Sequence, residues 1–479
     1  MTISNRISEN LRDLLSRFFL GVGYPAFVGV ITLVGYVSGW EFYLNALNML
    51  LLVAGILLTS SALPMIPTVL MFFFQTSMKN SPEDHVGSKY YHNPWIIGTM
   101  AALMLAAVVT VIYVTYKKRG SVSELFRGLP FPLAAALLTL AFLMNGAFTE
   151  EWTFDNTLYA ITVAAMYFPL FYFFVIGLRG EERERLIDYT VFSVVVTALV
   201  LSAETAHLYI TNDELIRDGE IIKEEVVYGW GMWTMAGQFL SVTIPICFLG
   251  VVRGKYRWLS FGAAALATLS AVMTLSRNSL IIGCGAFAVC AIICCFVGRS
   301  VKAFRIITPL GVLALLVLAF LFREKLVTLL ADYLDRGLSD NGRFELWRHG
   351  IASFIAAPLF GKGFLGIQRE LFQGCPEGFS LYPRMMHNTP IQLLGSMGIF
   401  GFLSYGYYRF KTLIPFIKKP SAEKCFMGMS LLVMLLASLI DNFVFMQKHL
   451  VFYSVILAVV FTLHTDGKTN DHQKRNDEI

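Results

Sequence analysis

Arginine and histidine side chains suited to phosphate and acid–base chemistry gather in two segments of the second half of the chain. Arg277 stands in a short turn between two apolar runs, and the segment 324–387 contains further basic residues before it ends at His387. A guanidinium binds two phosphate oxygens at once and keeps its proton, whereas an imidazole transfers protons near neutral pH. The pattern indicates an anionic substrate held beside a general base.

Each of these residues also has an ordinary structural interpretation. Arg277 taken alone is equally compatible with an arginine anchored at a membrane surface, with its charge in water. The segment 324–387 contains acidic residues too, so its arginines can be solvated or paired. His387 alone can cap the helix that follows it. The functional hypothesis therefore depends on the combination and not on one residue.

The elements that must position these residues are membrane-spanning helices. Of the 479 residues, 56% are hydrophobic and 15% are charged, whereas a soluble domain has nearer a quarter charged residues. Apolar runs recur from Phe18 to His464, and at about 20 residues each suffices to cross a hydrocarbon core of roughly 30 Å as a helix. We expect an all-α polytopic membrane protein with about 12 to 14 transmembrane helices and a large, partly helical external loop.

The apolar runs give the expected positions of the helices. The run 43–77 is too long for one span and contains Ser60 and Pro64, so we divide it into a hairpin. A single helix there would also move the basic cluster 117–119 to the outer side. The expected spans lie near 18–39, 43–60, 62–77, 95–116, 129–148, 157–178, 188–209, 232–252, 257–275, 278–297, 303–322, 388–408, 425–444 and 448–464.

The orientation of the chain follows from its basic clusters, because Lys and Arg next to spans stay on the cytoplasmic side. Such clusters occupy every second connection between spans. We therefore expect a multi-pass protein of the cytoplasmic (inner or plasma) membrane, with both termini cytoplasmic and the segment 324–387 external. The clusters lie at 117–119, 179–185, 253–257, 299–305 and 409–419.

The external segment has an internal order of its own. Residues 339–348 are typical of a turn that leads into a helix, predicted over 344–357 with a strongly apolar side and an end before Pro358. We expect this helix to lie at the membrane surface. The glycine-rich stretch 361–366 lacks the preceding strand and the spacing of a nucleotide-binding loop, so we interpret it as a sharp turn.

Five motifs in a fixed order resemble the bacterial O-antigen ligase and O-antigen polymerase family. They are Ser-Arg at 276–277, Gly-Arg-x-x-x-Trp at 342–347, Pro-Leu-Phe-Gly-Lys-Gly at 358–363, His-Asn at 387–388 and Gly-Ile-Phe-Gly at 398–401. The resemblance covers roughly residues 257–405, about a third of the chain. It implies a membrane glycosyltransferase that uses a polyprenyl (undecaprenyl) diphosphate-linked glycan as its donor.

The resemblance also implies roles for the arginines. Arg277 matches the family arginine of the short outer loop, and Arg343 matches the arginine of the large loop, so both would hold the diphosphate. Arg348 and Arg384 are further candidates for the same task. Preorganised cations beside hydrocarbon stabilise a charged leaving group far better than they do in water, so Arg277 also counts as catalytic.

His387 matches the family histidine that acts on the acceptor hydroxyl, as a general base or as a group that orients it. Asn388 would orient the histidine or a sugar. The resemblance implies an inverting, direct displacement, in which the acceptor sugar attacks the anomeric carbon as the lipid diphosphate departs.

No metal and no cofactor are expected. The acidic pairs Glu83-Asp84 and Glu150-Glu151 are adjacent and lack the Asp-x-Asp spacing, so we interpret them as solvated turn charges; arginine would take the place of a metal ion. The expected partners are the lipid-linked donor, a glycan or lipid-linked acceptor and the bilayer. Nucleic acid is not expected, because the basic residues form no continuous face.

The chain is divided into N-terminal transmembrane helices (1–256), a ligase- or polymerase-like core (257–410) that includes the external loop 324–387, and C-terminal helices with a short cytoplasmic tail (411–479). The same site residues serve a polymerase or a ligase, and we lean slightly to a polymerase or an unspecified glycan transferase. The competing class is a transporter or flippase of polysaccharide or lipid-linked sugar. Transporters place ionisable residues near the bilayer midplane, where this chain has mainly Glu204.

Overall fold

A computed structural model describes the chain at residues 3–72, 93–147, 154–212, 215–217, 220–221, 227–228, 231–297, 305, 343–363, 386–418 and 420–477. The predicted span 303–322, the acidic pairs at 83–84 and 150–151, Arg384 and most of the external loop lie outside these residues.

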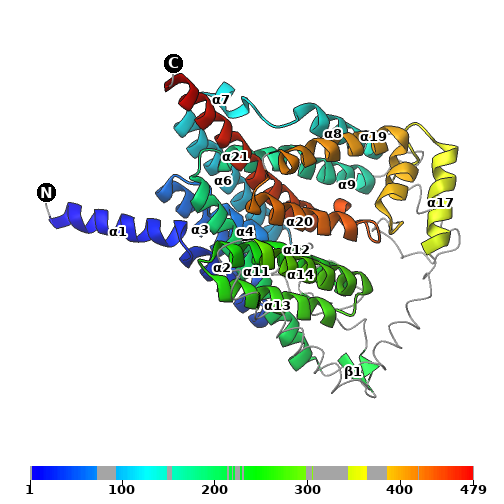
Figure 1. Ribbon diagram of the computed structural model, residues 1–479, viewed down its shortest axis with the longest axis horizontal. Coiled ribbons are helices and arrows are strands. Elements are labelled where there is room, and N and C mark those ends of the chain that lie inside the picture. The colour runs from blue at the N-terminus through cyan, green and yellow to red at the C-terminus, as the bar shows by residue number, and fades with distance from the viewer. Residues whose placement is uncertain are drawn as a thin grey trace.

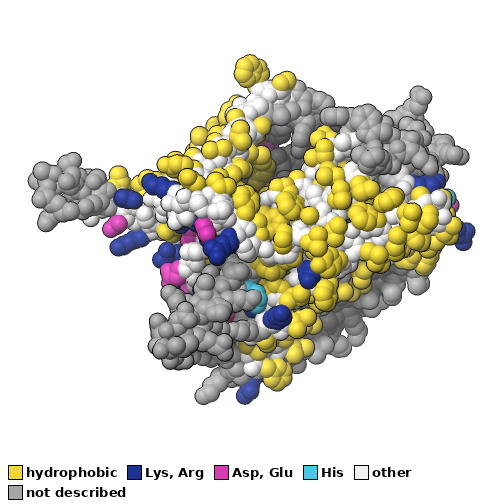
Figure 2. All heavy atoms as spheres, turned by 90° about the horizontal axis from the view of Figure 1, so that it is seen from above, with side chains coloured by type: hydrophobic (Ala, Val, Ile, Leu, Met, Phe, Trp, Pro, Cys, Tyr) yellow, Lys and Arg dark blue, Asp and Glu magenta, His cyan; other side chains and the backbone are white. Residues whose placement is uncertain are grey.

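The protein is an all-α polytopic membrane protein, as predicted (Figure 1). Six of its described helices are long and apolar enough to cross a bilayer, and three shorter helices are also apolar. Figure 2 shows hydrophobic side chains over most of one face, with charged side chains gathered mainly near one end. A surface of this kind is stable only against lipid.

The helices follow the predicted spans closely. They are α1 (Ile3–Leu20), α2 (Gly23–Ser38), α3 (Glu41–Thr59), α4 (Met65–Met71), α6 (Pro94–Arg119), α7 (Val122–Phe126), α8 (Pro132–Ala147), α9 (Phe154–Ala165), the π-helical turn Met166–Leu170, α10 (Phe171–Leu178), α11 (Arg183–Thr211), α12 (Trp233–Arg253), α13 (Arg257–Met273), α14 (Arg277–Phe296), α17 (Arg343–Ala356), α19 (Thr389–Ile417), α20 (Ala422–Ala437) and α21 (Gln447–Asp477). Two short antiparallel strand pairs, β1 (Ile216–Arg217) with β2 (Glu220–Ile221) and β3 (Val227–Tyr228) with β4 (Gly231–Met232), precede α12.

Two expectations about the first helices meet different outcomes. The predicted break within 43–77 is confirmed: α3 ends at Thr59, Ser60 adopts a left-handed φ of 52°, and α4 begins after Pro64. The predicted span 18–39 is not one straight helix. Its first residues belong to α1, which is bent by 64° from α2, and a side chain at Gly21 or Gly23 would collide with α1 at this bend.

Helices α11 and α12 form the buried centre of the bundle. Helix α11 packs against α2, α4, α12 and α13, and α12 packs against α13, α14 and α20. Small residues permit the close approach, since a Cβ added to Gly237 would lie 2.4 Å from the Thr274 hydroxyl and one on Gly250 would lie 2.4 Å from that of Ser260. Close packing at small residues is the usual way in which helices associate within a bilayer.

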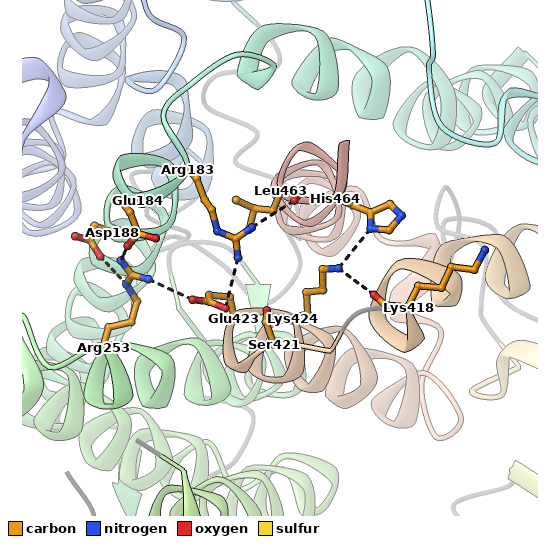
Figure 3. Close-up of polar contacts among 10 residues, drawn as sticks. All are labelled: Arg183, Glu184, Asp188, Arg253, Lys418, Ser421, Glu423, Lys424, Leu463 and His464. Carbon is orange, nitrogen blue, oxygen red and sulfur yellow. Dashed lines mark hydrogen bonds and ion pairs between the residues drawn. The ribbon is translucent and has the colours of Figure 1, made fainter. Parts of the chain in front are cut away.

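Ion pairs join several helix ends at one end of the bundle (Figure 3). Arg253, the last residue of α12, contacts Glu184 at 2.6 Å, Asp188 at 2.7 Å and Glu423 at 3.4 Å. Arg183 contacts Glu423 at 3.8 Å and donates to the carbonyl of Leu463 at 3.4 Å. The start of α11, the end of α12 and the start of α20 therefore meet one another beside Leu463 of α21, on the side that was predicted to be cytoplasmic.

We expect Arg253→Met to lower the free energy of unfolding by about 2 kcal/mol, because the acids around it lose a cation whose side chain is only 15% exposed. The measurement is thermal unfolding of the detergent-purified protein. Arg127→Met is the matched control, since Arg127 is 78% exposed beside Glu124, and such surface pairs contribute about 0 to 1 kcal/mol. Equal effects of the two substitutions would contradict the importance of this network.

Candidate active site

A histidine–aspartate pair lies at the opposite end of the bundle. His387 precedes α19 directly, and its Nδ1 is 2.6 Å from Oδ1 of Asp441, which follows α20. The Asp441 side chain is 8% exposed and that of His387 is 44% exposed. Because the carboxylate takes Nδ1, Nε2 is the ring nitrogen that can face a substrate.

The segments around the pair are held together by several hydrogen bonds. Asn388 caps α19, because its Oδ1 accepts from the Ile391 amide at 3.1 Å, and its Nδ2 donates to the Leu439 carbonyl at 3.2 Å. The Thr389 hydroxyl donates to the Ser438 carbonyl at 2.7 Å. The start of α19 therefore fixes the loop that contains Asp441.

The start of α14, which begins with Arg277, is linked to the Asp441 loop through one shared carbonyl. Arg277 is next to Asn278, whose Nδ2 donates to the carbonyl of Ala437 at 3.2 Å. The backbone N–H of Asp441 donates to the same carbonyl at 3.0 Å. The N-terminus of α14 carries a partial positive charge from the helix dipole, which adds to that of the guanidinium.

Gln238 of α12 approaches the other oxygen of the aspartate. Its Nε2 lies 3.4 Å from Oδ2 of Asp441, and both residues are buried. A carboxylate in such surroundings needs partners, and here they come from α12 and from His387. The chemistry that this arrangement can perform is proton abstraction by His387, supported by Asp441, next to a cation that can hold an anionic leaving group.

Helix α17 is packed beside the start of α19 (Figure 1). A Cβ at Gly350 would lie 2.5 Å from Ile391, so the helices touch closely there. Trp347 donates from Nε1 to the carbonyl of Met386 at 2.9 Å. Arg343 begins α17 one turn before Trp347 and so shares its face of the helix, which brings it to the side of the His387 segment, whereas Arg348 is exposed.

The two glycine motifs of the sequence dock on each other. Helix α19 is broken at Gly398, which has φ 62° and ψ −163°. Segment 358–363 fills the break with backbone hydrogen bonds, from the Lys362 and Gly363 amides to the carbonyls of 395 and 396 and from the amides of 399 and 400 to the carbonyls of 358 and 359. The amides of Lys362 and Gly363 thus bind carbonyls, which agrees with the rejection of a nucleotide-binding loop.

We expect Gly398→Ala to lower the free energy of unfolding by about 2 to 4 kcal/mol, because the new Cβ would lie 2.5 Å from the carbonyl carbon of Leu359. Gly406→Ala is the matched control on the same helix, where a Cβ meets nothing within 4 Å. Thermal unfolding of both purified variants gives the comparison. A stable Gly398→Ala protein would show that the docking of 358–363 does not constrain α19.

The structure brings together part of the predicted set and adds to it. His387 contacts Asp441, and Asn388 contacts Leu439 in the same loop. Arg277 is reached only through its neighbour Asn278, which binds the Ala437 carbonyl. Arg343 and Arg348 lie on the adjoining helix α17, and Arg384 is outside the described residues. Sequence reasoning missed Asp441 and Gln238. The available signal for Asp441 was an ionisable residue inside the apolar run predicted to span over 425–444, which is a reason to suspect a functional site.

The described residues contain no group of three or more His, Cys, Asp or Glu side chains arranged to hold a metal ion. Independence from metal stays a prediction, since the described part of the chain holds only some of the acidic residues.

Residues 262–406 match the family model described as O-antigen ligase. The matched range contains Arg277, Arg343 and His387, and it ends before Asp441. No curated protein matches the chain.

Proposed function

We propose that this membrane protein, which matches the O-antigen ligase family model over residues 262–406, is an enzyme of polysaccharide biosynthesis. It would be a glycosyltransferase acting on a polyprenyl diphosphate-linked glycan. It would transfer or polymerise this glycan at the outer face of the cytoplasmic membrane, with both termini inside. The observation that carries the proposal is the 2.6 Å contact of His387 with Asp441. The backbone amide of Asp441 shares the carbonyl of Ala437 with Asn278, which is the neighbour of Arg277 on α14.

In this reaction Nε2 of His387 takes the proton of the acceptor hydroxyl as its oxygen attacks the anomeric carbon of the donor sugar. The bond from that carbon to the diphosphate oxygen breaks, and the electron pair leaves with the lipid diphosphate. Attack from the face opposite the leaving group inverts the anomeric centre. Asp441 fixes the imidazole tautomer and stabilises the imidazolium, which afterwards releases its proton to water.

The departing diphosphate is the group that the arginines would hold. Arg277 combines its guanidinium with the N-terminus of α14, and Arg343 approaches from α17, with Arg348 and Arg384 as further contacts. Because these cations supply positive charge where negative charge develops, we expect no requirement for a metal ion. Asn388 uses both ends of its amide on the backbone, so we assign it the orientation of His387.

We expect His387→Ala and Arg277→Ala to lower the rate of glycan transfer by at least about 10²-fold, because the first removes the base and the second a cation at the leaving group. Asp441→Asn should lower it by about 10²- to 10⁴-fold, since the amide favours the wrong imidazole tautomer. The measurement is turnover of lipid-linked repeat units by the purified protein in proteoliposomes. Long polymer from this donor alone identifies a polymerase, and one-step transfer to a separate acceptor identifies a ligase.

Controls in the same assay separate the enzyme from a transporter. EDTA and Arg127→Ala are expected to leave transfer unchanged. Glu204→Gln is expected to do so as well, because Glu204 is fully buried in α11. If the His387→Ala variant and the Arg277→Ala variant both retained full activity, the assignment of the active site would be wrong. Movement of labelled lipid-linked sugar across the vesicle that depends on Glu204, with no change of linkage, would instead favour the transporter.

A further inference from the structure

His387 has an unusual backbone conformation for a residue that must hold a reactive ring in one place. Its φ is 49°, in the left-handed region, and it is one of four described residues other than glycine with a positive φ. Residues with a Cβ occupy this region at an energetic cost and keep it only where neighbouring contacts hold it. The contacts that hold His387 therefore decide where its imidazole points.

Those contacts act on the residue just before it. The Met386 amide donates to Oε1 of Gln392 at 2.7 Å, and the Met386 carbonyl accepts from Nε1 of Trp347 at 2.9 Å. Oε1 of Gln392 also accepts from Nδ2 of Asn442 at 3.0 Å, next to Asp441. Met386 and Gln392 are both buried.

We propose that Trp347 and Gln392 are positioning residues that hold the backbone of Met386 from its two sides and thereby set the orientation of His387. Gln392 binds the peptide on the N-terminal side of Met386, and Trp347 binds the peptide shared with His387. With both held, rotation about the bonds that join Met386 to His387 is restricted, and the imidazole meets Asp441. This inference rests on the proposed transferase function, in which His387 is the base.

The hydrogen bond from Trp347 to Met386 also makes the orientation of the His387 imidazole depend on the position of α17. Trp347 belongs to α17, and Gly350 one turn later lets that helix touch Met386 and Ile391. On its outer side α17 exposes Phe344, Ile351 and Ile355. If α17 lies on the surface of the bilayer, a shift of this helix moves the Trp347 indole N–H. The Met386 carbonyl, which accepts from that N–H, and the neighbouring His387 then move with it.

The experiment compares Trp347→Phe, Gln392→Leu and Gln392→Glu in the purified full-length protein. Phenylalanine keeps a ring without the N–H donor, and leucine keeps the size of glutamine without the acceptor oxygen. We expect both to lower kcat by about 10- to 100-fold, since small misplacements of a catalytic group cost rates of this order. KM for the lipid-linked donor should stay within about twofold. Gln392→Glu keeps the acceptor for Met386 and Asn442, and should restore most of kcat.

Trp258→Phe is the matched control, because Trp258 lies on α13 with most of its surface exposed; its kcat should equal that of the unchanged protein. Unchanged kcat in Trp347→Phe and Gln392→Leu would overturn the inference, as would equal losses in Gln392→Glu and Gln392→Leu. A fall in kcat matched by a loss of folded protein would also overturn it. His387→Ala is measured alongside: if it remains active, the proposed function fails, and if it alone is inactive, only the positioning inference fails.

A second, independent observation concerns the first helix. Helix α1 projects from the bundle in Figure 1 and is bent by 64° from α2. Its end is fixed, because the Tyr189 hydroxyl donates to the Phe19 carbonyl at 2.9 Å and a Cβ at Gly55 would lie 2.5 Å from the Phe19 ring. The preceding residues separate by face, with Leu11 and Leu14 on one side, Arg12 on the opposite side and Arg17 at the edge between the two.

The apolar side of α1 is unoccupied by protein among the described residues, with Leu11 54% and Leu14 64% exposed. It continues onto the outward surface of α2, because the Phe18 and Phe27 rings meet edge-on at 5.9 Å and Val30 is exposed beyond them. Since α2 is a membrane helix, we infer that α1 lies in the headgroup region of the same bilayer, with its leucines in lipid and its arginines among the phosphates.

A genetically encoded fluorescent amino acid placed at position 14 or at position 12 of the full-length protein tests this inference. The variants are reconstituted in vesicles of phosphatidylethanolamine and phosphatidylglycerol that contain a lipid with a quencher on the upper part of its acyl chain. We expect several-fold stronger quenching at position 14 than at position 12. Equal quenching at the two positions, weak or strong, would overturn the interfacial placement.

Discussion

The buried carboxylate of Asp441 imposes the constraint on which the end of the bundle around His387 depends. An ionised side chain beside hydrocarbon is costly unless other groups satisfy it. The partners of the Asp441 carboxylate are His387, 2.6 Å away, and Gln238, 3.4 Å away. The backbone amide of Asp441 donates to the carbonyl of Ala437, which also accepts from Asn278. Satisfying one aspartate thus brings together the start of α19, the end of α20, the outer part of α12 and the first turn of α14.

The glycine motifs serve the same site from a distance. Segment 358–363 occupies the break of α19 at Gly398 with four backbone hydrogen bonds, and it follows directly after α17. The break and its filling therefore fix α17 against α19 at one end, while Trp347 fixes it near His387. The two motifs are far apart in the sequence but pack directly on each other. A side chain on Gly361 would collide with the backbone of Ser396, and a side chain on Gly398 would collide with the backbone of Leu359.

Much of the fold could be predicted from the sequence, because a helix that crosses a bilayer must satisfy its own backbone and be apolar over its length. The ends of α6, α11, α12 and α14 accordingly lie within a few residues of the prediction. The bend between α1 and α2 was not foreseen, since both sides of it are apolar and only the geometry around Gly21 shows the break. The surface helix α17 was predicted because its apolar side and the proline after it are local signals.

The candidate site was predicted only in part, for a physical reason. Arg277 and His387 could be chosen because positive charge on the outer side and an imidazole at a helix start are visible locally. Asp441 could not be paired with His387 without knowledge of how α19 meets α20, since the two residues are 54 positions apart. The left-handed φ of His387 has no local signal either, because it is maintained by Trp347 and Gln392 from outside.

The extent of the functional unit follows from these contacts. The family match ends at residue 406, and the core expected from the sequence ends at residue 410. Two residues of the site lie outside both ranges. Asp441, which contacts His387, comes after them, and Gln238, whose side-chain amide contacts Asp441, comes before them. A chain limited to the matched residues would place His387 at a helix start with no carboxylate at Nδ1. It would also leave Asn278, the neighbour of Arg277, without the Ala437 carbonyl to which it donates. The proposed chemistry therefore requires an assembly of α12, α14, α17, α19 and α20, in which the matched segment contains Arg277, Arg343 and His387 and the carboxylate bound to His387 comes from outside it.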